Sequence, residues 1–152
     1  YCEEFLSNYE QRLLMLTSLC GGTTEVVRSW AQRGMPWGIV TNKAARFTEP
    51  IVRGLADLQP AMVVISGDTL AHAKPHPAPL LEAARRLAIE PARCLYVGDD
   101  LRDMQAARAA GMAGMAALWG YLGDAPVNDW GADALAHQPC DVLAWVEQRV
   151  GV

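Results

Sequence analysis

The most constraining feature of this sequence is the alternation of short, uninterrupted apolar runs with segments of helical periodicity. A strand that is buried on both faces of a parallel sheet has a continuous run of apolar residues. In a strand with one solvent-exposed face, apolar and polar residues alternate. The helical segments between the runs supply the crossovers that parallel strands need. The sequence therefore predicts an α/β fold with a parallel sheet covered by helices. The predicted strands are WGIV (37–40), AMVVI (61–65), CLYV (94–97), MAALW (115–119) and a short one near 133–136.

Helices are predicted wherever apolar residues recur at three- and four-residue spacing. An amphipathic helix over 2–16 is broken at Gly21-Gly22, and the next helix runs from Thr23 toward Gly34. Thr48-Glu49-Pro50 is predicted to open a further helix, because proline suits the first helical turn. The remaining predicted helices carry the apolar stripe 80–88, cover 101–110 up to Gly111, and cover 141–149.

Net charge and cysteine spacing argue against several classes of partner. A net charge of −4 argues against electrostatic attraction to nucleic acid or to an anionic membrane. The longest apolar runs are far shorter than a membrane span, and we expect no signal peptide. Cys2, Cys20, Cys94 and Cys140 are widely spaced without a Cys-x-x-Cys pair, which is typical of reduced thiols. We therefore expect a cytoplasmic protein with no nucleic-acid and no membrane partner.

Polar residues suited to phosphate follow two of the predicted strands. Thr41 and Asn42 come directly after WGIV, and Lys74 lies in the loop that follows AMVVI. Ligands of open parallel sheets bind beyond the carboxyl ends of the strands, so these groups are expected to meet at one edge. A hydroxyl, exposed backbone N–H groups and an amine suit phosphate oxygens.

A cluster of carboxylates follows the third predicted strand. Asp99 and Asp100 come directly after CLYV and Gly98, and Asp103 lies one helical turn further on. Adjacent carboxylates repel one another, so a fold that gathers them usually supplies a cation. Clustered carboxylates suit Mg²⁺, which keeps waters and bridges to phosphate. Together with the phosphate-binding groups, the cluster predicts a site for magnesium-dependent phosphoryl chemistry.

Each of these groups taken alone has a simpler interpretation. A Thr-Asn pair after a strand is often a turn, and a lysine before Pro-x-Pro is usually a solvated loop residue. Gly-Asp-Asp can cap a helix, because carboxylates suit helix N-termini. His72 and His76 are four residues apart, but the prolines around them argue against a metal-binding helix. The order of the groups, each at the end of its own strand, is what favours a functional site.

Three stretches of the sequence resemble the motifs of a known family. IVTNK, SGDTLAHAKPHPAPLL and LYVGDDLRDMQAARAAGM are similar to the second, third and fourth motifs of the haloacid dehalogenase-like (HAD) hydrolases. TNKAARFTEP and WGYLGDAPVNDWGAD resemble the phosphoglycolate phosphatases and N-acetylmuramate 6-phosphate phosphatases within that family. The resemblance implies a Rossmann-like three-layer core over 21–152, with 1–20 a remnant of the family's helical cap and hinge.

The resemblance also implies a role for each candidate residue. Thr41 would hydrogen-bond the phosphoryl oxygens with help from the Asn42 backbone N–H, and Lys74 would neutralise charge on the phosphate. Asp99 would ligate Mg²⁺. Asp103 would assist, either through a metal-bound water or by orienting Lys74. Asp100 would be a second, less typical metal ligand, since relatives often have serine there.

The sequence departs from the family at its first motif. Relatives attack phosphorus with the first aspartate of an Asp-x-Asp motif at the end of their first strand, and no two aspartates here have that spacing. The first strand and most of the cap are expected to be missing, and the start at Tyr1 suggests the C-terminal part of a longer protein. In the family this strand lies between the counterparts of WGIV and CLYV. The sheet should therefore close directly, be filled by the N-terminal segment, or accept a strand from another chain, as in a homodimer through the exposed edge.

Two functions from different classes follow from these observations. The first is a Mg²⁺-dependent phosphomonoester hydrolase of small phosphorylated metabolites, resembling phosphoglycolate phosphatase, with this chain inactive by itself. The alternative is a non-catalytic module that binds phosphate or assembles with a partner. A receiver domain fits less well, because its acidic pair precedes the threonine and lysine, the reverse of the order here. Phosphoglycolate and a phosphorylated amino sugar are not distinguished, because the cap that selects the substrate is expected to be absent.

Overall fold

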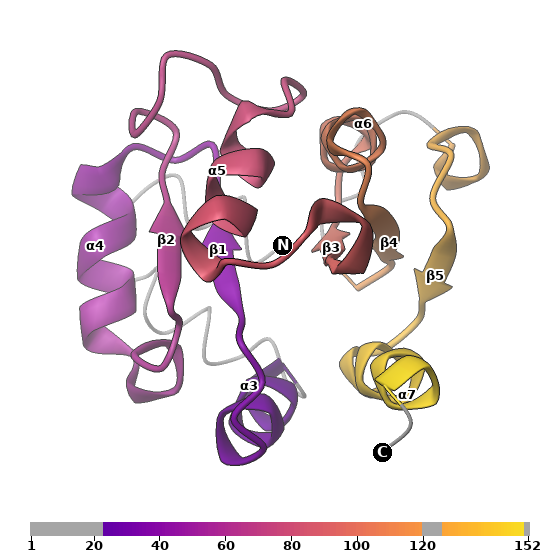
Figure 1. Ribbon diagram of the computed structural model, residues 1–152, viewed down its shortest axis with the longest axis horizontal. Helices are drawn as coiled ribbons and strands as arrows, with labels where there is room; N and C mark the ends of the chain where they lie inside the picture. The colour runs from indigo at the N-terminus through magenta and orange to yellow at the C-terminus, as the bar shows by residue number, and fades with distance from the viewer. Residues whose placement is uncertain (1–22, 120–125, 151–152) are drawn as a thin grey trace.

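The computed structural model describes residues 23–119 and 126–150, and Figure 1 traces their helices and strands. The described helices and strands alternate along the chain as the apolar pattern predicts. In chain order they are α3 (Thr23–Gln32), β1 (Gly38–Val40), α4 (Ala45–Gly54), β2 (Val63–Ile65), α5 (Ala78–Leu87), β3 (Leu95–Gly98), α6 (Leu101–Ala110), β4 (Ala113–Ala117), β5 (Ala134–Ala136) and α7 (Pro139–Val150). Short 3₁₀ helices occupy 56–58, 91–93 and 127–129.

The described strands form two parallel sheets. β1 pairs with β2, with Ile39 opposite Val64. β3, β4 and β5 form the second sheet in that order, with Val97 opposite Met115. The predicted α/β fold with parallel strands is therefore confirmed. None of the described helices is long and apolar enough to cross a bilayer.

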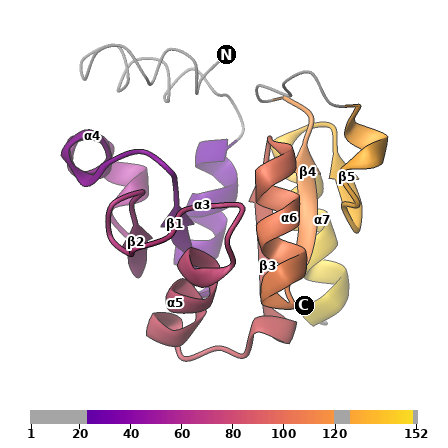
Figure 2. The same cartoon turned by 90° about the horizontal axis from the view of Figure 1, so that it is seen from above.

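Helices cover both faces of the sheets. Figures 1 and 2 show α5 and α6 on one face and α3 and α7 on the other, with α4 on the outer side of β2. One core cluster joins α5 to α6 and to the start of β4; it consists of Leu80, Ala84, Ala106, Ala107, Ala110 and Met112. On the opposite face, α3 contacts α7, and Arg33 forms an ion pair of 2.7 Å with Glu147. Helix contacts therefore join the two halves of the molecule.

Within the described part of the chain, no strand lies between β1 and β3, and the two sheets stay separate. This is the position at which the sequence predicts a missing first strand. Direct closure of the sheet, one of the expected outcomes, is not what the structure has. The predicted N-terminal helix over 2–16 and the cap remnant over 1–20 lie outside the described residues.

The start of α4 corrects one prediction. The helix begins at Ala45 rather than at Thr48, and Pro50 lies inside it. The reason is a remote cap, because the Asp68 carboxylate accepts a hydrogen bond of 2.8 Å from the Ala45 backbone N–H. Unpaired N–H groups in a first helical turn need such an acceptor. The helix stops at Gly54, and a separate 3₁₀ turn follows over 56–58.

The position of β4 is a second correction. The strand covers Ala113–Ala117, two residues earlier than the predicted 115–119. Ala113 and Gly114 pair with Leu95 and Tyr96 of β3, although such small residues carry little hydrophobic signal. Gly114 lies under α6, where an added Cβ would lie 3.1 Å from the Met104 sulfur. Close packing of helix on strand therefore sets the start of β4.

Candidate functional site

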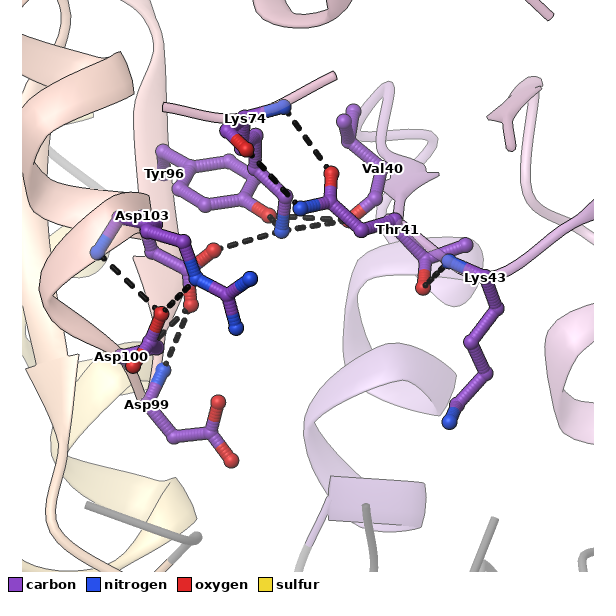
Figure 3. A network of polar contacts seen from close by, with 10 residues as sticks. Val40, Thr41, Lys43, Lys74, Tyr96, Asp99, Asp100 and Asp103 are labelled. Atoms are coloured by element: carbon purple, nitrogen blue, oxygen red, sulfur yellow. Dashed lines mark hydrogen bonds and ion pairs between the residues drawn. The ribbon is translucent and has the colours of Figure 1, made fainter. Parts of the chain in front are cut away.

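The predicted strand-end residues line one hollow at the carboxyl ends of β1 and β3. Its volume is about 240 Å³. The lining residues are Thr41, Asn42, Lys43, Lys74, Asp99, Asp100, Arg102 and Asp103. All six candidate residues are therefore brought together, with Lys43 and Arg102 added. Figure 3 shows how the side chains of Asp99 and Lys43 extend from the two sides of this hollow.

Lys74 and Asp103 form a buried ion pair inside the site. The Lys74 ammonium lies 2.5 Å from Asp103 Oδ1, and the two side chains are 9% and 8% exposed. Burial opposes the charge on Lys74, but the Tyr96 phenol oxygen and the Asp103 carboxylate outweigh it and leave its pKa raised. The other Asp103 oxygen accepts hydrogen bonds from the backbone N–H groups of Asp99 and Asp100. Asp103 thus lies directly against Lys74, and orienting this lysine, one of the two roles expected of Asp103, stays a prediction.

Tyr96 is a member of the site that sequence reasoning missed. Its hydroxyl oxygen accepts a hydrogen bond of 2.7 Å from Lys74 Nζ and donates one of 2.9 Å to the Val40 carbonyl. Lys74 Nζ also donates to that carbonyl at 3.4 Å. A tyrosine within an otherwise apolar strand was the available signal, because a buried phenol usually finds a polar partner. Tyr96 and Asp103 therefore fix the Lys74 ammonium from two sides.

The side chain of Asn42 holds the loop that carries Lys74. Its amide nitrogen donates to the Lys74 carbonyl at 3.0 Å, and its oxygen accepts from the Lys74 N–H at 3.0 Å. This paired contact positions the loop by side-chain atoms, whereas the expected contribution of Asn42 was its backbone N–H. The Thr41 hydroxyl accepts from the Lys43 N–H at 3.2 Å, and its own N–H is paired with Ile65 in β2.

Two glycines allow this close packing. A Cβ on Gly98 would lie 2.4 Å from the Cβ and Oδ2 atoms of Asp103. A Cβ on Gly67 would lie 2.0 Å from the Asn42 carbonyl oxygen. Real Cβ contacts are not this short, so any side chain at either position would displace its neighbour. Gly98 is thus required for the inward orientation of Asp103.

The three acidic residues have separate surroundings. Asp103 faces Lys74, and Asp100 caps α6 while accepting a bond of 2.5 Å from Arg102 Nε. Asp99 lines the hollow. In residues 23–119 and 126–150, no three His, Cys, Asp or Glu side chains gather as a protein-only metal site would need. Asp99 still fits Mg²⁺, which binds through one or two carboxylates and keeps several waters.

The two loop histidines lie outside the lining of the hollow. His72 and His76 stack with ring centroids 4.2 Å apart, and His76 Nδ1 accepts from the Ala78 N–H. His76 therefore has a structural contact at the start of α5. Arg102 is the lining residue for which the sequence offered no signal, because an exposed arginine in a first helical turn is unremarkable.

Comparison with known proteins shows the family to which the chain is similar. Residues 3–111 match the family model of the haloacid dehalogenase-like hydrolases. The chain is 49% identical over 137 residues to a phosphoglycolate phosphatase of Xanthomonas campestris pv. campestris, covering 90% of this chain and 62% of that protein. It is 37% identical over 143 residues to an N-acetylmuramic acid 6-phosphate phosphatase of Pseudomonas aeruginosa, covering 93% and 63%.

A solved structure agrees with these matches. The crystal structure of a predicted phosphoglycolate phosphatase from Haemophilus somnus superposes with a TM-score of 0.75 at 27% identity, covering 80% of this chain and 54% of that one. The chain thus spans less than two thirds of the length of these relatives. The matched range includes every residue that lines the hollow, and this chain belongs to the haloacid dehalogenase-like hydrolase family.

Proposed function

We propose that the hollow binds the phosphate group of a small phosphorylated metabolite, and that the protein functions as a Mg²⁺-dependent phosphomonoester hydrolase. The observation that carries the proposal is Lys74, which is held charged and nearly buried beside Thr41 and Asn42. A fixed ammonium beside hydroxyl and N–H donors is the arrangement that stabilises phosphoryl charge. The sequence identity of 49% with a phosphoglycolate phosphatase supports a small phosphorylated acid as the substrate.

The residues of this chain would bind and orient rather than attack. Lys74 would neutralise phosphoryl charge, Thr41 would donate its hydroxyl, and Asp103 would keep Lys74 in place. Asp99 would hold Mg²⁺, with Asp100 joining if it releases Arg102. The ion would neutralise further phosphate charge when bound. We expect calorimetry to give Mg²⁺ affinity weaker than micromolar, lost in Asp99→Asn; micromolar affinity would contradict this arrangement.

Hydrolysis needs a nucleophile that this chain does not offer in the Asp-x-Asp form. We infer that the chain alone does not hydrolyse p-nitrophenyl phosphate above background, since a covalent phosphoryl intermediate needs an attacking carboxylate. Mg²⁺-dependent turnover that disappears in Lys74→Ala would contradict the inference. It would mean that another residue of this chain attacks phosphorus.

Phosphate binding without turnover would support the second candidate, a phosphate-binding module. Inorganic phosphate titrated in the presence of Mg²⁺ and followed by ³¹P NMR tests the site directly. Binding should weaken at least about tenfold in Lys74→Ala, because a charge-assisted contact is worth about 1.5–3 kcal/mol. Arg86→Ala, which removes an exposed cation of α5, is the matched control and should bind as the parent does. An equal loss of phosphate affinity in both variants would mean that only the net charge of the protein attracts phosphate.

Two further expectations belong to this proposal. A cytoplasmic location is supported by Cys94 and Cys140, which are both free thiols. The homodimer through the exposed sheet edge stays a prediction, which light scattering after size exclusion tests. The unpaired edges of β1 and β3 face each other inside the molecule, so a dimer there would need a strand of one copy to enter the other.

A further inference from the structure

Two ion pairs line the hollow at different depths. Lys74 and Asp103 form the inner pair, with side chains that are 9% and 8% exposed. Arg102 and Asp100 form the outer pair, with side chains that are 60% and 30% exposed. All four residues line the same hollow. A phosphate group held by Lys74 would therefore place the rest of a substrate nearer the rim, beside Arg102.

The outer pair is suited to exchange its carboxylate for that of a ligand. Arg102 Nε lies 2.5 Å from Asp100 Oδ2, which also accepts from the Arg102 backbone N–H at 3.3 Å. A solvent-accessible ion pair stabilises a protein little, because water competes for both charges. Asp100 is also the candidate second ligand of Mg²⁺, a role in which it releases Arg102. The contact with Asp100 thus shows that Arg102 takes a carboxylate at the rim of the hollow, and this carboxylate is replaceable.

Lys43, another cation of the lining, suits phosphate better than it suits a carboxylate. Its backbone N–H donates to the Thr41 hydroxyl at 3.2 Å, so it lies next to a group expected to bind phosphate. Lysine binds phosphate as a point charge, whereas a planar guanidinium matches the two oxygens of a carboxylate with two parallel donors. Arg102 also lies in the first turn of α6, where the helix dipole attracts anions. A carboxylate at the rim is therefore best recognised by Arg102.

We propose that Arg102 binds the carboxylate of a phosphorylated acid whose phosphate group is held by Lys74, and that it thereby selects acidic over neutral phosphate esters. The inference rests on the proposed function, because it requires phosphate at Lys74. In the structure Asp100 supplies the carboxylate that the substrate would replace. Contacts at both ends of a small molecule fix its orientation, so Arg102 would position the ester without contacting phosphorus. Arg102 is thus a specificity-determining residue of the core itself.

Two phosphate esters that differ in a single group test the proposal on the whole chain. Phosphoglycolate carries a carboxylate, and ethyl phosphate has a methyl group in its place. With Mg²⁺ present, ³¹P NMR titration should show that phosphoglycolate binds about fivefold more tightly than ethyl phosphate. Arg102→Ala should remove this preference. Arg86→Ala, which removes an exposed cation of α5, is the matched control and should keep it.

Arg102→Lys separates direct contact from charge. Lysine keeps the positive charge but lacks the planar pair of donors, so the preference for phosphoglycolate should fall to about twofold. The Arg102 Nε–H resonance, assigned by its absence from this variant, should shift on adding phosphoglycolate and much less on adding ethyl phosphate. Because the Arg102 side chain is largely exposed, the urea midpoints of both variants should stay near that of the parent.

The outcomes separate this inference from the function on which it rests. No binding of inorganic phosphate to the parent would overturn both. Phosphate binding that depends on Lys74, without a preference between the two esters, would overturn the inference alone. So would a preference that Arg102→Ala or Arg102→Lys retains in full, because charge without a guanidinium contact would then attract the carboxylate. Equal weakening of both esters in Arg102→Ala would place Arg102 at the phosphate group and would overturn the inference as well.

Discussion

At the scale of single residues, the Asp103 carboxylate links the start of α6 to the Lys74 ammonium. One oxygen pairs with Lys74, and the other accepts from the N–H groups that open α6. The side chain is 8% exposed, so its charge is balanced by neighbours rather than by water. Gly98 provides the space in which this carboxylate turns inward. A small set of contacts therefore determines both the start of α6 and the position of the Lys74 ammonium.

Replacing Asp103 with asparagine should destabilise the protein by about 3–5 kcal/mol, because it leaves the buried Lys74 charge without its counter-ion. The double variant Asp103→Asn with Lys74→Met should be less destabilised than Asp103→Asn alone. Urea denaturation of both variants and of Lys74→Met measures the coupling. Additive free energies of unfolding would show that the pair contributes nothing beyond its parts.

The pH dependence of stability follows from the direction of the Lys74 shift. The pKa is raised above the ordinary value of 10.5, so the stabilisation is fully present below about pH 10.5. It is lost as pH rises through the raised folded-state pKa. The difference in unfolding free energy between the parent and Lys74→Met should therefore stay level from about pH 7 to 10 and decline above that range. A decline already between pH 7 and 9 would contradict the raised pKa.

Gly98→Ala should cost about 1–3 kcal/mol, because the added methyl group would overlap Asp103. It should also weaken phosphate binding, since Asp103 could no longer hold Lys74 in place. Gly114→Ala in neighbouring β4 is the matched control. There the nearest atom is the Met104 sulfur at 3.1 Å, in a flexible side chain that can move. Equal effects of the two changes on urea midpoints would refute the importance of the Gly98–Asp103 contact.

At the scale of elements, helix ends depend on partners far away in sequence. Asp68 caps α4 from a loop that follows β2, and Asn42 holds the Lys74 loop by two backbone contacts. Gly67 permits the close approach of these loops, because a side chain there would overlap the Asn42 carbonyl. Its N–H donates to the Lys43 carbonyl at 2.6 Å. The loops at this edge of the sheet are therefore ordered by one another.

Asp68→Ala should reduce stability by about 1 kcal/mol, because it removes the acceptor for the first N–H of α4. Hydrogen exchange at the Ala45 amide should accelerate in the same variant. Asp68→Asn keeps a side-chain oxygen at the same position, so it should restore most of the loss. If alanine and asparagine behave alike in urea denaturation, the cap contributes nothing to the helix.

At the scale of the whole molecule, two half-sheets are joined mainly by helices. Contacts of α5 with α6 and of α3 with α7 join the half-sheet β1–β2 to the half-sheet β3–β4–β5, one on each face. At the carboxyl end, Lys74 and Tyr96 reach from the loop and from β3 to the Val40 carbonyl. Cooperative unfolding of the two halves should therefore depend on these bridging contacts rather than on strand pairing.

Leu80→Ala should cost about 2–5 kcal/mol, since Leu80 is 1% exposed in the cluster that joins α5 to α6. Because this cluster links the halves, thermal unfolding of the variant should broaden or separate into two transitions. Leu135→Ala is the control, since Leu135 is 41% exposed on β5 and its loss should change stability by less than about 0.5 kcal/mol. A single sharp transition in Leu80→Ala would show that other contacts couple the halves.

The sequence by itself determined the parallel α/β architecture and which polar residues meet at one edge of the sheets. Continuous apolar runs predict strands buried on both faces, and β1, β2 and β3 lie where those runs do. Carboxyl ends of parallel strands share an edge, so Thr41, Lys74 and Asp99 were expected together without any contact being known. These predictions succeeded because they depend on local periodicity and on strand direction, which a sequence displays.

Only the tertiary structure decided how the site residues are used. Several contacts at the site join residues that are 23 to 56 positions apart in sequence, namely those of Tyr96, Asp68 and the Asn42 side chain. No local sequence pattern predicts such contacts. The start of β4 at Ala113 was missed because small residues carry little hydrophobic signal, whereas their packing under α6 is decisive. The acidic residues read as one cluster in sequence, but folding turns Asp103 toward Lys74 and Asp100 toward Arg102. Spacing brings charges near one another, and only the packed environment of each charge selects its partner.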